Sequence, residues 1–320
     1  MNGISLVVNK SEIGAGTRGS SLGPEAIEVA AINEQSEIFN RYKRVKIVHN
    51  NESIYNEVTT PSAIRIEQMH DLYQSISNTI SDQLFDDKFA LVFSGDHGSA
   101  GGTIAGVKKA FPFDEIGVVW IDAHGDLHSP YTSPTGNMHG MPLSTALSVD
   151  NTDYAINELN DKTRSLWNKI KNLDGISPKI KPENLVMLGV RDTELAEDML
   201  MKNLGIRNYT VEEIRKERIN SIAKRVLNRL DNCGKIYISF DVDVMDCDLI
   251  SHGTGTPVPN GLMPKHIIDI VTKIVKSGKV VCLEFVEVNP TLDEKKNRMA
   301  EAAFEVLKEV LPIIEKFSTT

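Results

Sequence analysis

Short apolar runs alternate along the chain with longer segments in which apolar residues recur every three or four positions. The runs have the length and the β-branched content of strands that are buried on both faces of a parallel sheet. The predicted strands are Ile4–Val8, Val45–His49, Phe89–Phe93, Ile116–Ile121, Leu185–Val190, Ile206–Tyr209, Ile236–Phe240 and Val280–Val286.

The segments between these runs have the spacing of amphipathic helices. Thr210 and Glu213 form the Thr-x-x-Glu pattern of a helix start, and Pro24 suits a first helical turn. The predicted helices are Pro24–Ala31, Ile64–Leu84, Val211–Leu230, Pro264–Ser277 and Glu294–Phe317.

Strand followed by helix, repeated about eight times, predicts an α/β fold with a mostly parallel sheet covered by helices. No linker-like stretch divides the chain, so we predict one domain over residues 1–320. The alternation alone does not decide between an open sheet and a closed barrel. Long irregular segments at Gly125–Gly140 and Asp243–Pro259 each follow a predicted strand, where α/β proteins bind ligands.

The composition narrows the class of protein. The chain has 35 basic and 44 acidic residues and a formal net charge of −9, which argues against nucleic-acid and anionic-membrane partners. No run approaches the about 18 apolar residues of a membrane span, and the N-terminus lacks a signal-peptide pattern. The three cysteines, Cys233, Cys247 and Cys282, are far apart, which indicates a reducing, cytoplasmic environment without a thiolate zinc cluster.

Histidines and aspartates gather where three of the predicted strands end. These residues are His97, then Asp122, His124 and Asp126, then Asp241 and Asp243. On an extended backbone, spacings of two place side chains on one side. Carboxylates this dense are unfavourable unless a cation binds them. Oxygen and imidazole ligands suit Mn²⁺, with Fe²⁺, Co²⁺ and Ni²⁺ left open, and their number suggests two ions sharing carboxylates.

These segments resemble the metal signatures of the ureohydrolase family, which comprises arginase, agmatinase and relatives. The resemblance covers Gly-Asp-His ending at His97, Asp-Ala-His-Gly-Asp at 122–126 and Ser-Phe-Asp-Val-Asp at 239–243. Further segments at 133–140, 188–192, 253–257 and 286–290 resemble arginases most. The resemblance implies a three-layer α/β/α fold around a mostly parallel sheet of about eight strands.

The resemblance also implies a role for individual residues. One Mn²⁺ would be held by His97, Asp122, Asp126 and Asp241, and the other by Asp122, His124, Asp241 and Asp243. The residues expected to act in catalysis are His139, Glu287 and the ligand Asp126. A hydroxide between the metals would attack the guanidinium carbon, Glu287 would pair with the guanidinium, and His139 would transfer a proton. Because Glu284 lies three residues before Glu287, only one of the two should reach the site.

A second set of residues resembles the arginase contacts to the amino-acid end of the substrate. This set comprises His128, Ser133, Thr135, Asn137, Glu194, Glu197 and Thr256. Two of its members depart from the arginase pattern, because His128 replaces an asparagine and Glu194 replaces an aspartate. The segment Asp246–His252 also departs, being one residue longer than usual.

We therefore predict a binuclear manganese hydrolase that converts L-arginine to L-ornithine and urea. The alternatives are another ureohydrolase, such as agmatinase, guanidinobutyrase or formimidoylglutamase, and a non-catalytic metal-binding homologue. The expected partner is a small guanidino compound. By resemblance, the chain should form a homo-oligomer, a trimer or a hexamer.

Overall fold

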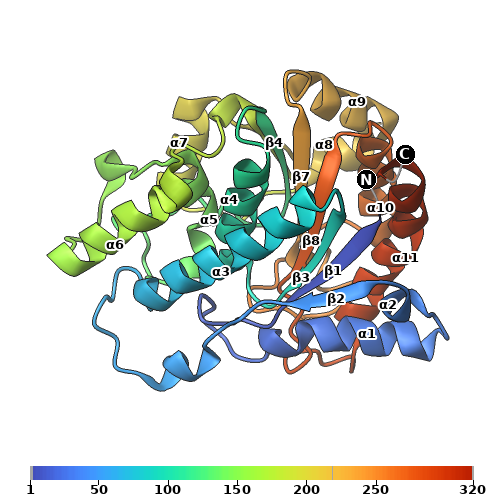
Figure 1. Cartoon of the computed structure of the whole chain (residues 1–320), viewed down its shortest axis with the longest axis horizontal. Coiled ribbons are helices and arrows are strands. Elements are labelled where there is room, and N and C mark those ends of the chain that lie inside the picture. Colours follow the sequence, from blue (N-terminus) through green and yellow to red (C-terminus); the bar gives the residue numbers. More distant parts are fainter. Residues whose placement is uncertain (1–2, 218, 319–320) are drawn as a thin grey trace.

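The computed structural model describes residues 3–217 and 219–318, and an eight-stranded sheet runs through its centre (Figure 1). The strand order is β2-β1-β3-β8-β7-β4-β5-β6, and all neighbouring strands are parallel. Because β2 and β6 are the two edges, the sheet is open rather than a closed barrel. The strands are β1 (Ile4–Asn9), β2 (Lys43–Lys46), β3 (Phe89–Ser94), β4 (Ile116–Ile121), β5 (Leu185–Leu188), β6 (Arg207–Tyr209), β7 (Lys235–Asp241) and β8 (Val280–Val286).

Helices cover both faces of this sheet, so the predicted three-layer α/β/α architecture is confirmed (Figure 1). One buried cluster joins the sheet to α1 (Gly23–Asn33), α9 (Ile219–Arg229), α10 (Pro264–Val275) and α11 (Arg298–Ser318). The other joins it to α3 (Ile66–Phe85), α4 (Ala100–Ala110), α5 (Pro142–Leu147) and α6 (Asp161–Lys171). The remaining helices are α2 (Ile38–Arg41), α7 (Leu195–Leu204) and α8 (Val211–Lys216). No helix among the described residues is long and apolar enough to cross a membrane.

The edge strand β2 begins two residues before the predicted start, at Lys43, and it ends at Lys46, before Val48. Its pairing with β1 places Lys43 opposite Ser5 and Lys46 opposite Val8. Val48, which the hydrophobic pattern assigned to the strand, is 79% exposed. An edge strand is paired on one side only. Hydrogen bonding to β1, rather than apolar content, therefore determines where β2 begins and ends.

The predicted helix Val211–Leu230 is two helices, α8 and α9. The Thr210–Glu213 capping box at its start is present. The helix then breaks at Glu217, whose backbone is extended and whose carboxylate accepts a hydrogen bond from Arg225 at 2.6 Å. Helical spacing continues across the break, so the periodicity could not reveal it. At the C-terminal end, α11 starts at Arg298 and not at Glu294, because the Asp293 carboxylate accepts the backbone N–H of Met299.

Helix α4 was not predicted, because three glycines lower the helix propensity of its sequence. The glycines have a packing role instead. A Cβ atom at Gly102 would lie 3.0 Å from the Cβ of Ile76, and one at Gly106 would lie 2.8 Å from the Cβ of Ile80. Glycine thus lets α4 approach α3 closely, and packing against α3 overrides the low propensity.

The four central strands lead into the predicted chemistry. Strands β3, β8, β7 and β4 are consecutive neighbours in the sheet. His97 follows β3, Asp122–Asp126 follows β4, Asp241 ends β7 and Glu287 follows β8. Since parallel strands end at the same edge, these residues are brought together although they are far apart in sequence.

Candidate metal centre and substrate pocket

His97 lies at the centre of a group of buried carboxylates. Its Nδ1 atom is 3.0 Å from Asp122 Oδ2, 3.1 Å from Asp126 Oδ2 and 3.0 Å from Asp241 Oδ2. Nδ1 nevertheless makes no hydrogen bond of acceptable geometry. Three carboxylates around one unsatisfied imidazole nitrogen form a set of donor atoms that a cation would satisfy.

Protein contacts fix the orientation of the His97 ring. Its Nε2 atom lies 2.7 Å from the Ser239 hydroxyl, and its face stacks on Trp120 with ring centroids 4.0 Å apart. Trp120 in turn donates its Nε1–H to Asp122 Oδ2 at 2.9 Å. With Nε2 bound to Ser239, Nδ1 is the nitrogen presented to the carboxylates, which is typical of a metal-ligating histidine.

His124 forms a second group beside the first. Its Nδ1 atom is 2.9 Å from Asp243 Oδ2 and 3.5 Å from Asp122 Oδ1. Asp122 therefore contacts both histidines, one through each carboxylate oxygen. Two ligand groups that share Asp122 are arranged as a binuclear centre would require.

The electrostatics of the carboxylates also fit bound cations. Burial, with the charge of Asp122 next, raises the pKa of Asp126 to about 6. Burial and the charge of Asp243 raise the pKa of Asp241 well above its usual range. Ionised carboxylates packed this closely destabilise the metal-free protein, and divalent cations would relieve that repulsion. Asp126 differs from the expected extended geometry, because its backbone is left-handed with φ of 51°.

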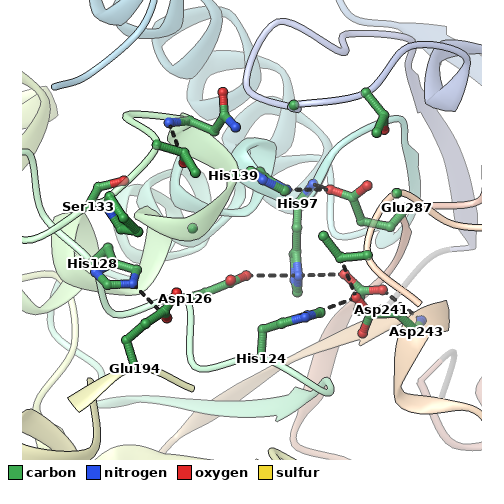
Figure 2. A pocket seen from close by; sticks show the side chains of 18 of the residues that line it. His97, His124, Asp126, His128, Ser133, His139, Glu194, Asp241, Asp243 and Glu287 are labelled. Atoms are coloured by element: carbon green, nitrogen blue, oxygen red, sulfur yellow. Dashed lines mark hydrogen bonds and ion pairs between the residues drawn. The ribbon is translucent and has the colours of Figure 1, made fainter. Parts of the chain in front are cut away.

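His139 and Glu287 meet on the opposite side of His97 (Figure 2). His139 Nδ1 lies 3.3 Å from Glu287 Oε1, which also accepts the backbone N–H of His97 at 2.8 Å. Burial acts to lower the pKa of His139, but Glu287 outweighs it, and the pKa is raised to about 9. Glu284 points elsewhere, where it accepts hydrogen bonds from Ser94 and Tyr237 inside the protein. The expectation that only one of the two glutamates reaches the site is confirmed.

Asp96 is a residue that the sequence analysis did not assign to the site. It is fully buried, its Oδ2 accepts the Gly14 N–H at 2.9 Å, and its Oδ1 has no hydrogen-bond partner. Burial, with the charge of Glu287 next, raises its pKa to about 7. The sequence signal that could have identified Asp96 is its place in Gly-Asp-His, directly before a predicted metal ligand.

A pocket of about 230 Å³ opens over these residues (Figure 2). All seven residues predicted to contact substrate line it, namely His128, Ser133, Thr135, Asn137, Glu194, Glu197 and Thr256. The Thr256 hydroxyl, however, donates to Asp243 Oδ2 at 3.2 Å, so it orients a candidate metal ligand. In the loop before His139, Gly136 has φ of 73° and its Cβ position is blocked by the Pro61 carbonyl, so only glycine fits.

The wall of the pocket away from the metal centre carries hydrogen-bond donors and acceptors in separate places. The hydroxyl oxygens of Ser133 and Thr135 accept backbone N–H groups of Gly136 and Asn137, at 2.9 and 3.2 Å. Their own O–H groups are left to donate. Glu194 supplies acceptor oxygens, because the hydrogen bond from His128 lowers its pKa to about 2. Burial raises the pKa of Glu197 to about 8, and its two oxygens already accept the backbone N–H groups of Leu127 and Glu194.

Three comparisons with known proteins show what the chain is similar to. The sequence model of the arginase family matches residues 4–312. An arginase of Bacillus subtilis is 33% identical over 311 residues, covering 96% of this chain and 97% of that protein. An arginase of Brevibacillus brevis is 32% identical over 311 residues, with the same coverage. The crystal structure of arginase from Bacillus caldovelox superposes with a TM-score of 0.83 at 29% identity, covering 97% of this chain and 98% of that one.

The α/β/α fold with its clustered aspartates and histidines defines a ureohydrolase. The chain belongs to the arginase family. It is therefore a hydrolase that acts on guanidino C–N bonds.

Proposed function

We propose that the protein is an arginase, which hydrolyses L-arginine to L-ornithine and urea. The observation that carries this proposal is the pocket wall away from the metal centre, which offers hydroxyl donors from Ser133 and Thr135 at one place and the acceptor carboxylate of Glu194 at another. A carboxylate and an ammonium group on one carbon atom, as in an α-amino acid, need such a pairing.

The proposed cofactor is a pair of Mn²⁺ ions. One would be held by His97, Asp122, Asp126 and Asp241, and the other by Asp122, His124, Asp241 and Asp243. The oxygen-rich donor set without sulfur supports manganese, with Co²⁺, Ni²⁺ and Fe²⁺ as substitutes. When bound, such a pair supplies a hydroxide nucleophile near neutral pH.

Glu287 is proposed to hold the guanidinium group. Its Oε1 is occupied by His97 and His139, whereas Oε2 accepts no hydrogen bond from the described part of the chain. A carboxylate oxygen in this position can accept a guanidinium N–H, a charge-assisted contact that fixes the plane of the reacting group.

His139 is proposed to deliver a proton to the leaving amine. Its contact with Glu287 raises the pKa of the imidazole and so favours the protonated form that a proton donor requires. The δ-amino group of ornithine is a poor leaving group unless it is protonated as the C–N bond breaks. Asp126 contributes as a ligand that faces both His97 and the pocket.

The test is a product assay on protein loaded with Mn²⁺, using L-arginine, agmatine, 4-guanidinobutyrate and formiminoglutamate. We expect urea from L-arginine at a kcat/KM at least about tenfold above the next substrate, which corresponds to roughly 1.4 kcal/mol of discrimination. Faster turnover of agmatine would make the protein an agmatinase. Two bound metals without turnover of any of the four would indicate a non-catalytic homologue.

We also propose that residues 1–320 act as one domain in a homo-oligomer, a trimer or a hexamer, in the cytoplasm. The expectation of an oligomer comes from the resemblance to the family. Light scattering of the purified protein coupled to size exclusion would measure its mass against the monomer.

A further inference from the structure

We propose that Cys247, Asp248 and His252 bind a thiophilic divalent cation such as Zn²⁺ or Co²⁺, at a site separate from the aspartate-rich centre. One ligand atom from each residue lies within 4.8 Å of the other two. Cys247 Sγ is 3.9 Å and His252 Nε2 is 3.7 Å from Asp248 Oδ1. Tetrahedral zinc bonds of about 2.0–2.3 Å place ligand atoms roughly 3.3–3.7 Å apart, so small side-chain movements would close the site.

Glu294 independently orients the histidine for this role. Its carboxylate lies 3.1 Å from His252 Nδ1, and it accepts the backbone N–H of His252 at 3.2 Å. Glu294 therefore favours the tautomer with a proton on Nδ1 and a free lone pair on Nε2. Metal-binding histidines are commonly held by a carboxylate in this way.

The turn that carries the three residues is held in place without a cation. The Ile250 N–H donates to the Asp246 carbonyl at 2.8 Å. Lys295 donates to the carbonyls of Asp248 and Ile250, at 3.3 and 3.0 Å. The side chains thus start close to their binding geometry, which reduces the ordering that binding would require.

Charge and access are also suitable. Once the Cys247 thiol is deprotonated on binding, it and the carboxylates of Asp248 and Glu294 carry three negative charges, and Lys295 offsets one of them. A divalent cation would make the cluster neutral. Cys247 is 3% exposed, but the side chains of Asp248 and His252 are 68% and 46% exposed, so an ion can enter from solvent.

The ligand chemistry separates this site from the catalytic one. The aspartate-rich centre contains no sulfur, whereas a thiolate selects softer ions than Mn²⁺. Of the other two cysteines, Cys282 lies inside β8, and Cys233 is buried with its thiol beside Asn232. The site also lies in the Asp246–His252 segment, where the chain departs from the arginase pattern. On binding, the Cys247 thiol would lose its proton to solvent and form an S–metal bond.

The experiment uses the full chain with its main centre filled by excess Mn²⁺, followed by titration with Co²⁺. We expect a sulfur-to-cobalt charge-transfer band in the near ultraviolet that saturates at one Co²⁺ per chain. Only a thiolate ligand produces this band, so Co²⁺ that exchanges into the sulfur-free centre stays silent. Cys247→Ser should abolish the band, and the matched variant Cys233→Ser should retain it.

Glu294→Gln keeps all three ligands and tests the orienting contact. We expect it to weaken Co²⁺ binding about 10- to 100-fold while the band remains at saturation. A wild-type protein without the band, or a band that persists in Cys247→Ser, would overturn the proposal. Urea release is not a readout here, so failure of the cation site leaves the proposed arginase activity to its own test. Circular dichroism of each variant confirms that it is folded.

Discussion

His128 Nε2 lies 2.9 Å from Glu194 Oε2, so the two positions at which the pocket departs from the arginase pattern contact each other (Figure 2). His128 Nδ1 lies 3.1 Å from the Thr132 hydroxyl. Both ring nitrogens therefore have protein partners. The hydrogen bond from His128 is the largest cause that lowers the pKa of Glu194, to about 2. The extra methylene of glutamate over aspartate lets the carboxylate reach the ring, so the two departures act as a pair.

The first prediction is a double-mutant cycle on this pair. His128→Asn and Glu194→Asp should each lower kcat/KM for L-arginine about 5- to 30-fold, because each leaves its partner without its hydrogen bond. The double variant restores the arginase combination. Its loss of transition-state free energy should be smaller than the sum of the two single losses, and the difference, a coupling energy, should be about 0.5–3 kcal/mol. Strict additivity of the free-energy losses would contradict the pairing.

The second prediction concerns the hydroxyl donors. Ser133→Ala removes a donor proposed to bind the substrate carboxylate, so KM for L-arginine should rise about 5- to 30-fold, which corresponds to roughly 1–2 kcal/mol for a hydrogen bond to a charged group. Agmatine lacks the carboxylate, and its kinetics should be nearly unchanged. An equal loss with both substrates would place Ser133 in a structural role, through its bond to the Gly136 N–H.

The third prediction is a shift in pH profile. His139 with its pKa of about 9 acts as a proton donor, so activity should fall as pH rises through the imidazole pKa. Two bound cations would lower that pKa in the working enzyme. Glu287→Gln removes the carboxylate that raises it, so the alkaline fall should move to lower pH, and KM should rise through loss of the guanidinium contact. His139→Ala should lower kcat about 10²- to 10⁴-fold with metal content unchanged. If Glu287→Gln does not shift the alkaline fall in activity, His139 is not the group whose titration causes that fall.

The sequence was sufficient to predict the central strands and the residues at their ends. Buried parallel strands such as Ile116–Ile121 are continuous apolar runs, which are easily recognised, and the ligands come directly after them. Strand order could not be read from alternation, because β3 and β8 are neighbours through pairings between residues almost 200 positions apart. The break at Glu217 and helix α4 depend on tertiary contacts that local periodicity does not contain.

The same distinction holds within the site. The identities of the candidate ligands follow from residue type and spacing, and the structure brings all of them together. The His128–Glu194 contact joins residues 66 positions apart and had no local signal. Thr256 lines the pocket, and its hydroxyl also bonds to Asp243, a partner that only the folded loop reveals.

The fourth prediction tests the packing of α4. Gly106→Ala adds a methyl group 2.8 Å from the Ser77 carbonyl oxygen and from the Cβ of Ile80, both on α3. Overpacking of this kind costs about 1–3 kcal/mol, which exceeds the roughly 1 kcal/mol that alanine gains in helix propensity. We expect a lower free energy of unfolding in urea. An increase in stability would show that α4 can move away from α3 without cost.

The fifth prediction links metal binding to pH. The raised pKa values of Asp126, at about 6, and of Asp241 mean that the folded, metal-free protein holds their protons more tightly than the unfolded chain does. Their contribution to the stability of the metal-free protein is fully present below the ordinary carboxyl pKa of about 4. This contribution is lost as the pH rises through the pKa values of the folded protein. Stabilisation by bound Mn²⁺ has the opposite pH dependence, because protons compete with the ion for the same oxygens.

The increase in Tm on adding excess Mn²⁺ should therefore be larger at pH 7.5 than at pH 5, as measured by thermal unfolding in parallel with a chelated sample. At a free Mn²⁺ concentration of about 100 times Kd, the stabilisation is about 2.7 kcal/mol. Asp126→Asn removes one of the competing protons, so its Mn²⁺-dependent Tm shift should be smaller and less dependent on pH. A shift that is equal at both pH values in the wild type would mean that these aspartates are not the groups that bind the metal.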